Sequence, residues 1–578
     1  MKTVLGSIRH LLATGNKTHM LWCIGILLLL LILAVLHHRW RDDPQKLKKW
    51  RWLALLPFLA ALAHFLLYSL SYLQAATVFI SIYFIGIISL IPVLFAKRRI
   101  GYRIVSTLTG LLTVLTGTLF ILQSPNFFNY ARKSYTESFR GLVTAMDRHY
   151  ILKEWKEVDF AALEVKYMPL VQEAEKEQNP EKFYDAIKQF STEMHDGHIF
   201  VEGNFDEKAY PPQSQFREYG LTIVRLDDGS MIAVCTSEEV NKLGITDGTV
   251  ITKWNGKPIE QSVEEVVVDE ALPVKANQDR LAPMNLDWVG GETVEVAFLD
   301  KSGKEKTVTL SDQEDKHTHN EAFQAFAQIS DIGSPDSFRK LQEENFSTQM
   351  LNDKCGYLKI TMEGTANTTQ DMLGYVSGNH KWAREMFRGK LRDLKAQGME
   401  YLVIDMRNNM GGFDEIGCAL CDLLTTGDWF GQGLGIRKNG TYTCVSDHGI
   451  HGDGEFADLN VVALTNYSCA SAGDGTCLYL SKLPNVTVAG ITDPNGCNQE
   501  TGGTCVLSGG IVTVGFPTGL ILDENSVPNV DTRADRISRN PVEERIPFDR
   551  DAAMKIFRDK EDYELNWAVT YLEAQAAG

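Results

Sequence analysis

The sequence predicts a multidomain chain: a membrane region first, then a helical segment, a small β-rich domain and an α/β core. Charge is the first indication. Residues 1–133 contain 15 Lys and Arg against 2 Asp and Glu, although the 578-residue chain has a formal net charge of −17. A basic, apolar front joined to an acidic, polar remainder is typical of a membrane anchor followed by a soluble part. The acidic part has no basic stripe, so we expect no nucleic-acid partner.

Four long apolar runs fill the basic front. Each holds about 17 to 21 residues, close to the roughly 20 that a helix needs to cross a bilayer. Four such runs with almost no internal charge favour membrane helices over a signal peptide or buried soluble helices. Residues 1–125 are therefore expected to form four transmembrane helices in contact with a lipid bilayer, at 20–36, 53–73, 77–95 and 104–122.

Loop charges predict how the chain is oriented in the membrane. The loops after the first and third runs carry clusters of Lys and Arg, whereas residues 69–76 carry no charge. Because positively charged short loops stay in the cytoplasm, the first and third loops are expected inside. The chain is thus expected to be a multi-pass protein of the cell membrane, with its N-terminus and everything after residue 122 outside. The basic N-terminal residues Lys2, Arg9 and Lys17 compete with this orientation.

The cysteines fit an extracytoplasmic location. Nine of the ten lie beyond residue 200, and many thiols in an exported domain suggest disulfides, although an odd number leaves at least one unpaired. Cys497 and Cys505 bracket a Gly-rich loop and are predicted to pair. Cys418-x-x-Cys421 follows a Gly-Gly turn without a second such motif, which favours packing or a disulfide over zinc. We expect no metal and no cofactor.

Composition and periodicity divide the rest of the chain. Residues 126–205 have apolar side chains at helical spacing, residues 206–312 alternate β-like runs with turns, and residues 313–354 are polar and predicted to be a linker with some helix. Residues 355–578 are predicted to be α/β, since helix-like stretches separate strand-like runs at 356–361, 401–405, 461–465, 486–489 and 510–514.

One stretch of the β-rich region has a recognisable pattern. It reads Leu-Gly-Ile-Thr-Asp-Gly-Thr-Val-Ile-Thr-Lys-Trp-Asn-Gly-Lys-Pro over residues 243–258. Asn255-Gly256 is a strong signal for a β-hairpin turn. The pattern resembles a PDZ module, which would bind an extended peptide by adding it as a strand to a sheet edge. A generic small β-rich domain is the alternative.

Residues 466–474, Asn-Tyr-Ser-Cys-Ala-Ser-Ala-Gly-Asp, lie between a strand-like and a helix-like run. A serine among small residues at such a turn can be exposed, with unpaired backbone N–H groups nearby. A serine nucleophile needs this environment. Taken alone, however, a serine at this place is more often a helix cap.

Two further motifs precede this stretch. They are Asp196-Gly197-His198, and Val-Ile-Asp-Met-Arg-Asn-Asn-Met-Gly-Gly at residues 403–412. With the PDZ-like module, the three motifs resemble the tail-specific (C-terminal processing) protease and tricorn superfamily of serine peptidases, over most of residues 135–550. The resemblance implies a crotonase-like β/α core with Ser471, rather than Ser468, as the nucleophile. It also implies an oxyanion hole built from the N–H groups of Gly411 or Gly412 and of Ala472.

The catalytic base is expected to be a histidine. The tail-specific branch uses a lysine in a "G-x-x-T-x-G-K-G" element, but Gly496 occupies the lysine position here. The tricorn-like branch uses a histidine before the PDZ-like region, which corresponds to His198, with His195 as a nearby decoy. A neutral imidazole near pH 7 can accept a serine proton.

The group that would orient this histidine stays open. The tricorn pattern has a serine just before the histidine, where this chain has Gly197, and a glutamate before the final strand. Asp535, Asp531 and Glu500 are the candidates. A missing orienting group can reduce the rate by orders of magnitude without abolishing activity.

Three functions follow from these expectations. The first is a membrane-anchored serine endopeptidase that cleaves exported proteins or peptides through an acyl-enzyme. The second is a catalytically weak or inactive protein that binds peptides or other ligands on the same fold. The third is a membrane sensor or transporter with an outer ligand domain, which the absence of charges inside the apolar runs does not support.

Overall fold

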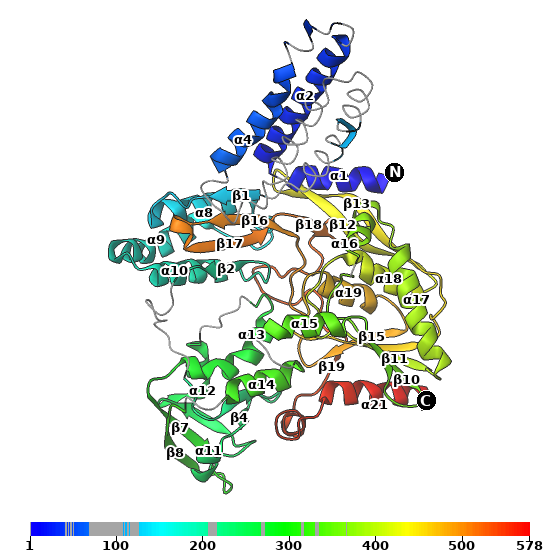
Figure 1. Cartoon of the computed structure of the whole chain (residues 1–578). Helices are drawn as coiled ribbons and strands as arrows, with labels where there is room; N and C mark the ends of the chain where they lie inside the picture. The colour runs from blue at the N-terminus through cyan, green and yellow to red at the C-terminus, as the bar shows by residue number, and fades with distance from the viewer. Residues whose placement is uncertain are drawn as a thin grey trace.

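The computed structural model describes residues 2–68, 108, 110–112, 115 and 126–577, except 15, 41–42, 44, 47–48, 50, 206–216, 267–271, 314–316, 330–334 and 366. In Figure 1 a small β-rich unit (green) and the N-terminal helices (blue) extend from opposite ends of a larger α/β body. The C-terminal helix α21 (Tyr563–Ala577) lies against that body, beside the central sheet.

The central sheet confirms the predicted α/β core. Its strands lie in the order β19-β15-β14-β11-β10-β9, and all neighbours are parallel except the edge strand β9. Their bounds are β9 (Thr348–Met350), β10 (Cys355–Lys359), β11 (Tyr401–Asp405), β14 (Asn460–Leu464), β15 (Val486–Gly490) and β19 (Glu544–Arg545). The sequence predicted the bounds of β11 correctly, and those of β10, β14 and β15 to within two residues.

Both faces of this sheet are buried, as a parallel sheet requires. Alternate side chains of β11 enter different cores: Leu402 and Ile404 face one, and Tyr401 and Val403 face the other. The first core is covered by α17 (Lys381–Ala396), α18 (Asp414–Leu424) and α19 (Ala472–Ser481). The second is covered by α21 and by residues of the β-rich unit.

A second sheet joins the N-terminal helical segment to the end of the core. Its order is β1-β16-β17-β2, with β1 (Asn126–Asn129), β2 (Phe200–Gly203), β16 (Thr501–Val506) and β17 (Val512–Pro517). Side chains of β16 and β17 share one apolar core with three helices. These are α8 (Tyr135–His149), α9 (Phe160–Glu177) and α10 (Pro180–Thr192). Residues 196–198, which follow α10, are therefore held close to the loops of the α/β core.

A third sheet, in the order β13-β12-β18, flanks the core. It consists of β12 (Asp428–Lys438), β13 (Thr441–His451) and β18 (Leu520–Leu522). Helix α16 (Thr368–Ser377) packs nearby, with Tyr375 in contact with Leu434 and Ile521. The sheet also forms the surface on which the first helix of the chain lies.

The β-rich unit contains the predicted hairpin. Strand β5 (Ile251–Trp254) pairs antiparallel with β6 (Lys257–Pro258), and Asn255-Gly256 is the two-residue turn. Both turn residues have positive φ, 51° and 74°, as the type I′ turn of a two-residue hairpin requires. The remaining strands are β3 (Thr222–Arg225), β4 (Met231–Val234), β7 (Thr293–Leu299) and β8 (Glu305–Ser311). In the linker 313–354, α14 (Thr318–Ala327) and α15 (Pro335–Glu344) are the expected helical parts.

The N-terminal region begins with α1 (Lys2–Thr14), α2 (Lys17–Arg39) and α4 (Leu56–Tyr68). Among the residues that the structure describes, no helix has both the length and the apolar character that a bilayer crossing requires. The predicted membrane run 77–95 lies outside the described residues, as does nearly all of the run 104–122.

The cysteine predictions need one correction. All ten cysteines are unpaired, so the predicted Cys497–Cys505 disulfide is wrong. Cys505 lies in the core that β16 and β17 share with α8, α9 and α10, while the Cys497 thiol donates to Asn495 Oδ1 at 2.9 Å. Cys418 and Cys421 are both fully buried in the core against α19, as expected for packing residues.

Candidate active site

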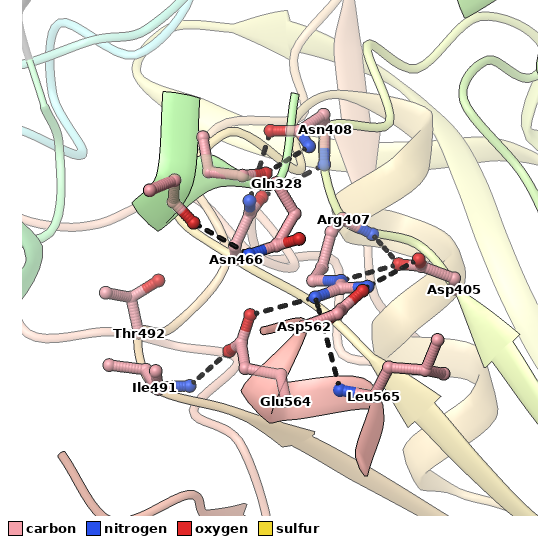
Figure 2. Close-up of polar contacts among 12 residues, drawn as sticks. Gln328, Asp405, Arg407, Asn408, Asn466, Ile491, Thr492, Asp562, Glu564 and Leu565 are labelled. Atoms are coloured by element: carbon pink, nitrogen blue, oxygen red, sulfur yellow. Dashed lines mark hydrogen bonds and ion pairs between the residues drawn. The ribbon is translucent and has the colours of Figure 1, made fainter. Parts of the chain in front are cut away.

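Two loops leave the same edge of the central sheet and meet there. Strands β11 and β14 are parallel neighbours in which Asp405 is opposite Leu464, so residues 406–412 and 465–471 both begin at the carboxyl edge. Figure 2 shows Asn408 and Asn466 facing each other across the gap. The Asn408 N–H donates to Asn466 Oδ1 at 3.0 Å, and Asn466 Nδ2 donates to Asn408 Oδ1 at 3.1 Å. The two motif loops are therefore joined directly.

Arg407 supports the first loop from below. Its guanidinium binds Asp405 and Asp562 and lies 3.3 Å from Glu564, with only 3% of the side chain exposed (Figure 2). Burial alone would raise the pKa of Asp405, but Arg407 holds it below its usual value. Burial raises the pKa of Glu564 to about 7. A buried ion pair of this kind is a brace: breaking it would leave uncompensated charge in the core.

Ser471 lies at the turn into α19 with a strained backbone, φ 58° and ψ −133°. This conformation is rare for a residue with a side chain and is found where surrounding contacts enforce it. The Ser471 N–H donates to Cys497 O at 2.8 Å, and Ser471 O accepts from Gly475 N at 3.0 Å. The hydroxyl makes no capping hydrogen bond to the helix. Although Ser471 is the residue at the N-cap, its side chain therefore does not cap the helix.

Gly411 lies directly against Ser471. A Cβ at Gly411 would be 2.4 Å from Ser471 Cβ and 2.8 Å from Ala472 N, and φ is 79°, so only glycine fits. The Gly411 N–H is already bonded to Asn409 Oδ1 at 2.8 Å. Within the described part of the chain, the N–H groups of Gly412 and Ala472 donate to no protein acceptor. These two donors are the ones left for an oxyanion.

Glu363 braces the glycine pair. Its N–H donates to Gly411 O at 2.8 Å, and its carbonyl accepts from Phe413 N at 2.7 Å. The Gly412 N–H lies between these two hydrogen bonds in the sequence and takes part in neither of them. At Gly412 φ is 145°, and a Cβ there would lie 2.2 Å from Glu363 O. The brace and the glycines together fix the position of the Gly412 N–H.

His198 is brought to the same region by its neighbour Gly197. A Cβ at Gly197 would be 2.4 Å from Asn495 Oδ1 and 2.8 Å from Cys497 Sγ, and Cys497 is the residue whose carbonyl accepts from Ser471. The Nδ1 atom of His198 is buried without a partner, whereas Nε2 is not enclosed in this way. Burial lowers the pKa of His198, although the Asp196 carboxylate opposes the shift. The imidazole is thus neutral near pH 7.

Asp196 holds the histidine segment in place. Its Oδ1 accepts from the His198 N–H at 2.9 Å, and its Oδ2 accepts from the Tyr150 hydroxyl at 2.7 Å. Asp196 is fully buried. The Asp-Gly-His motif therefore works as a unit: the aspartate anchors, the glycine permits close approach, and the histidine projects from the anchored turn.

Residues 354–512 match the model of peptidase family S41. The match covers the α/β core from β10 to the start of β17 and includes the Ser471 and Gly411 loops. It gives the enzyme class: the chain is a serine-type peptidase, a hydrolase that acts on peptides or proteins. No curated protein matches the sequence.

Several solved structures are similar in overall arrangement. Mature CPAF complexed with lactacystin has a TM-score of 0.47 at 14% identity, covering 76% of this chain and 97% of its own. The photosystem II D1 C-terminal processing protease has 0.31 at 17%, covering 72% and 94%. The tricorn protease has 0.35 at 14%, covering 77% and 37%. At these values, residue roles must come from the geometry of this chain.

None of the three acids predicted to orient His198 contacts it in the described structure. Asp535 is exposed and accepts from the Ile537 N–H in a surface turn. Asp531 is buried and accepts from Asn498 N and from the Gln499 amide. Glu500 binds His10 and Tyr375. The orienting role of these three acids stays a prediction, and within the described residues none of them is hydrogen-bonded to His198.

Asp474, which ends the serine motif, shapes the loop at residues 495–497. Its Oδ2 accepts from Gly496 N at 2.7 Å and its Oδ1 from Asn540 Nδ2 at 2.8 Å. Burial raises its pKa to about 8. The sequence did not single out Asn540, because a buried asparagine far along the chain carries no motif. Asp474 and Asn540 hold residues 495–497 against Ser471.

Lys156 is a second residue that sequence reasoning missed. Its Nζ is buried and donates to His195 O at 2.9 Å and to Thr532 Oγ1 at 3.1 Å. Burial lowers its pKa, while the carboxylates of Asp196 and Asp531 oppose the shift. His195, the decoy histidine, has a left-handed backbone and a pKa lowered to about 4 by burial. Its carbonyl accepts from Lys156 Nζ, and its side chain makes no hydrogen bond to Ser471 among the described residues.

A cavity of about 390 Å³ adjoins the histidine side of the site. Gly197 and Asn495 line it, and the rest of the lining comes from Tyr184, Lys188, Ser191, Thr192, Ile199, Phe200, Val201 and Leu272. This mixture of apolar and polar groups suits a peptide side chain. The loops of the α/β core and the Asp196-Gly197-His198 turn thus bring together an uncapped serine, two unpaired N–H donors, a neutral histidine and an adjacent cavity.

Proposed function

We propose that this chain is a membrane-anchored serine endopeptidase of the tail-specific and tricorn-like type. Ser471 is the nucleophile and His198 the general base. The observation that carries the proposal is the Ser471 turn, whose hydroxyl caps no helix and whose Cβ lies against Gly411. A strained serine beside unpaired N–H donors is the arrangement that acyl transfer needs.

The reaction follows from these positions. His198 Nε2 accepts the Ser471 hydroxyl proton as Oγ attacks the peptide carbonyl carbon. The N–H groups of Gly412 and Ala472 stabilise the negative oxygen of the tetrahedral intermediate; each such donor is worth about 3 to 4 kcal/mol. His198 then gives the proton to the leaving amine, and the C–N bond breaks. Water attacks the acyl-enzyme by the same steps in reverse order and releases Ser471.

The substrates we propose are exported proteins or peptides. The β-rich unit would act as a PDZ-like module that selects an extended peptide by strand addition. The cavity beside Gly197 and Asn495 would take a substrate side chain. Residues 1–125 would anchor the enzyme in the cell membrane through four helices, with the peptidase outside, as the loop charges suggest.

A second candidate function is peptide binding without cleavage. The observation in its favour is Nδ1 of His198, which is buried and has no acceptor to hold the tautomer. A triad without its third member retains catalysis at a greatly reduced rate. The two functions predict different outcomes with a mechanism-based probe.

A fluorophosphonate probe followed by peptide mapping tests the proposal. We expect labelling at Ser471 that is lost in Ser471→Ala and His198→Ala. The matched control is His195→Asn, which suits the left-handed backbone there, φ 43°, and should leave labelling unchanged. Absence of labelling in the unaltered protein, together with no cleavage of casein, would establish the binding function instead.

Orientation in the membrane is tested separately. An Asp535→Cys variant in a Cys444→Ser background presents an exposed thiol, because the other nine native cysteines are buried. A membrane-impermeant maleimide should label it in intact cells. Labelling only after permeabilisation would place the peptidase on the cytoplasmic side.

A further inference from the structure

The first helix of the chain is packed into the peptidase. Figure 1 shows α1 beside β13, at the junction of the N-terminal helices and the α/β body. The contact is close: a Cβ at Gly6 would lie 2.0 Å from Val445 O. His10 and Ser7 are fully buried, and Ser7 Oγ lies 3.4 Å from Ser446 Oγ. Neither the S41 match, which begins at residue 354, nor any catalytic motif accounts for this docking.

His10 makes the most specific contact of α1. Its Nδ1 lies 2.5 Å from Gly435 O and its Nε2 lies 2.7 Å from Glu500 Oε2. A backbone carbonyl can only accept, so Nδ1 carries a proton. Glu500 also accepts from the Tyr375 hydroxyl, as an ionised carboxylate does. Nε2 and Glu500 share the second proton. Their contact raises the pKa of His10 and lowers that of Glu500, which favours a buried imidazolium paired with a carboxylate.

A short chain of contacts leads from this pair to the oxyanion loop. Tyr375, which donates to Glu500, packs edge-on against Phe413 with the ring centroids 6.4 Å apart. Leu11 of α1 packs in the same apolar cluster as Phe413. Phe413 directly follows Gly412, and its N–H is bonded to Glu363 O in the brace described above. His10 is thus connected to Gly412 through Glu500, Tyr375 and Phe413.

We propose that α1 is part of the catalytic unit and that His10 is a positioning residue, which holds Glu500, Tyr375 and Phe413 so that the Gly412 N–H points at the oxyanion. This inference rests on the proposed function. A contact that served only adhesion would be at least as strong with apolar side chains, because burying an ion pair is costly. The hydrogen-bonded charged pair of His10 and Glu500 instead fixes the position of the Glu500 carboxylate, and with it that of Tyr375.

The pair also makes the docking depend on pH. Burial would lower the pKa of His10, but Glu500 and the Gly435 carbonyl raise it above its usual value. Burial would raise the pKa of Glu500, but His10 and Tyr375 lower it. The docking contribution is therefore full between the ordinary pKa values of the two groups, 4.5 and 6.5, and falls outside that window. It is lost as pH rises through the raised pKa of His10, and as pH falls through the lowered pKa of Glu500. Other ionisable groups facing this region are His448 on β13, Asp414 and Glu415 on α18, and Tyr375 on α16.

The test compares variants of the full-length protein in kcat, KM and fluorophosphonate labelling. For His10→Gln and Glu500→Gln we expect kcat to fall about 10- to 100-fold, as for a catalytic group displaced by about 1 Å. KM should stay within about twofold, since the oxyanion donor acts in the transition state. The double variant should be no worse than either single variant. Arg9→Gln, on the exposed face of α1, should match the unaltered protein.

A wedge variant separates docking from the chemistry of His10. Gly6→Val places side-chain atoms against Val445 O and should reduce kcat like His10→Gln, while Gly25→Val meets nothing within 4 Å and should not. Hydrogen exchange at residues 411–413 should speed up in Gly6→Val and His10→Gln, even if either variant is poorly active. Unchanged exchange and unchanged kcat in folded His10→Gln would overturn the inference. Failure of the proposed function would show differently, as absent labelling of Ser471 in the unaltered protein.

Discussion

Asn408 and Asn466 exchange two hydrogen bonds and so join the loop at residues 406–412 to the loop at residues 465–471, which contains Ser471 (Figure 2). Neither side chain is a catalytic group. Backbone groups in a loop beyond the end of a strand have no neighbouring strand to bond to. Here the two asparagine side chains supply hydrogen bonds between the loops instead. The distance between Gly412 and Ser471 is therefore controlled by side chains four and five residues away.

Replacing Asn466 tests this link. Asn466→Ala leaves the buried Asn408 N–H without an acceptor, which should cost about 1 to 3 kcal/mol of stability. It should also reduce kcat. Asn466→Asp keeps the acceptor and should lose less in both respects. Urea denaturation and steady-state kinetics measure the two effects, and equal stability of the Ala variant and the unaltered protein would contradict the link.

Gly411→Ala tests the fit of the oxyanion loop. Gly440 is the matched control, because it has φ 75° and open space where Gly411 has φ 79° and the Ser471 Cβ at 2.4 Å. Both substitutions impose the same backbone strain, of order 1 kcal/mol. Only Gly411→Ala should lower kcat/KM, by about 100-fold or more, as for the loss of an oxyanion donor. Similar activity in the two variants would mean that the contact is not functional.

The pH dependence of kcat/KM reports the base. The pKa of His198 is lowered by burial, so the protonated, inactive form appears only at pH values below its usual 6.5. Activity should therefore persist as pH falls through 6.5 and be half-lost at a lower pH. The His195→Asn variant should give the same acidic limb. A midpoint at or above 6.5 would argue against His198 as the base.

Arg407→Met tests the brace beneath the loop. The variant keeps the side-chain volume but leaves Asp405, which is 2% exposed, without its counter-charge. We expect a loss of about 3 to 5 kcal/mol in unfolding free energy, the usual effect of removing one partner of a buried pair. The control is Arg392→Gln, whose ion pair with Glu455 lies on the surface and should contribute less than about 1 kcal/mol. The midpoints of denaturant unfolding, compared at the same dependence of the unfolding free energy on denaturant concentration, distinguish the two variants.

Local signals in the sequence predicted a large part of this architecture. The run 401–405 is apolar at every position except its last, and it became a central strand buried on both faces. Asn255-Gly256 predicts the hairpin turn because both residues tolerate the positive φ that the turn requires. Ser471 and Gly411 lie in loops whose positions follow from the strands before them. In each case the pattern and the contacts that enforce it lie within a few residues of each other.

The missed features depend on distant partners. Asp535, Asp531 and Glu500 could not be placed because their distance from His198 is set by the pairing of β2 with β17. The predicted Cys497–Cys505 disulfide is wrong because Cys505 lies in strand β16, in the core that this strand shares with α8, α9 and α10. The docking of α1 carries no signal at all, since His10 and Glu500 are 490 positions apart. Asn540 and Lys156 are isolated polar residues until the fold encloses them.

The Asn126 side chain donates to Thr14 O, so the last residue of α1 and the first residue of β1 touch. The chain leaves the folded body and returns to it at the same place. Helix α1 is in this sense an outlying piece of the folded body, which it contacts through Thr14 and Asn126. A bilayer crossed between residues 14 and 126 must be crossed back. A short linker from residue 14 to residue 126 should accordingly give a water-soluble peptidase that retains its first helix.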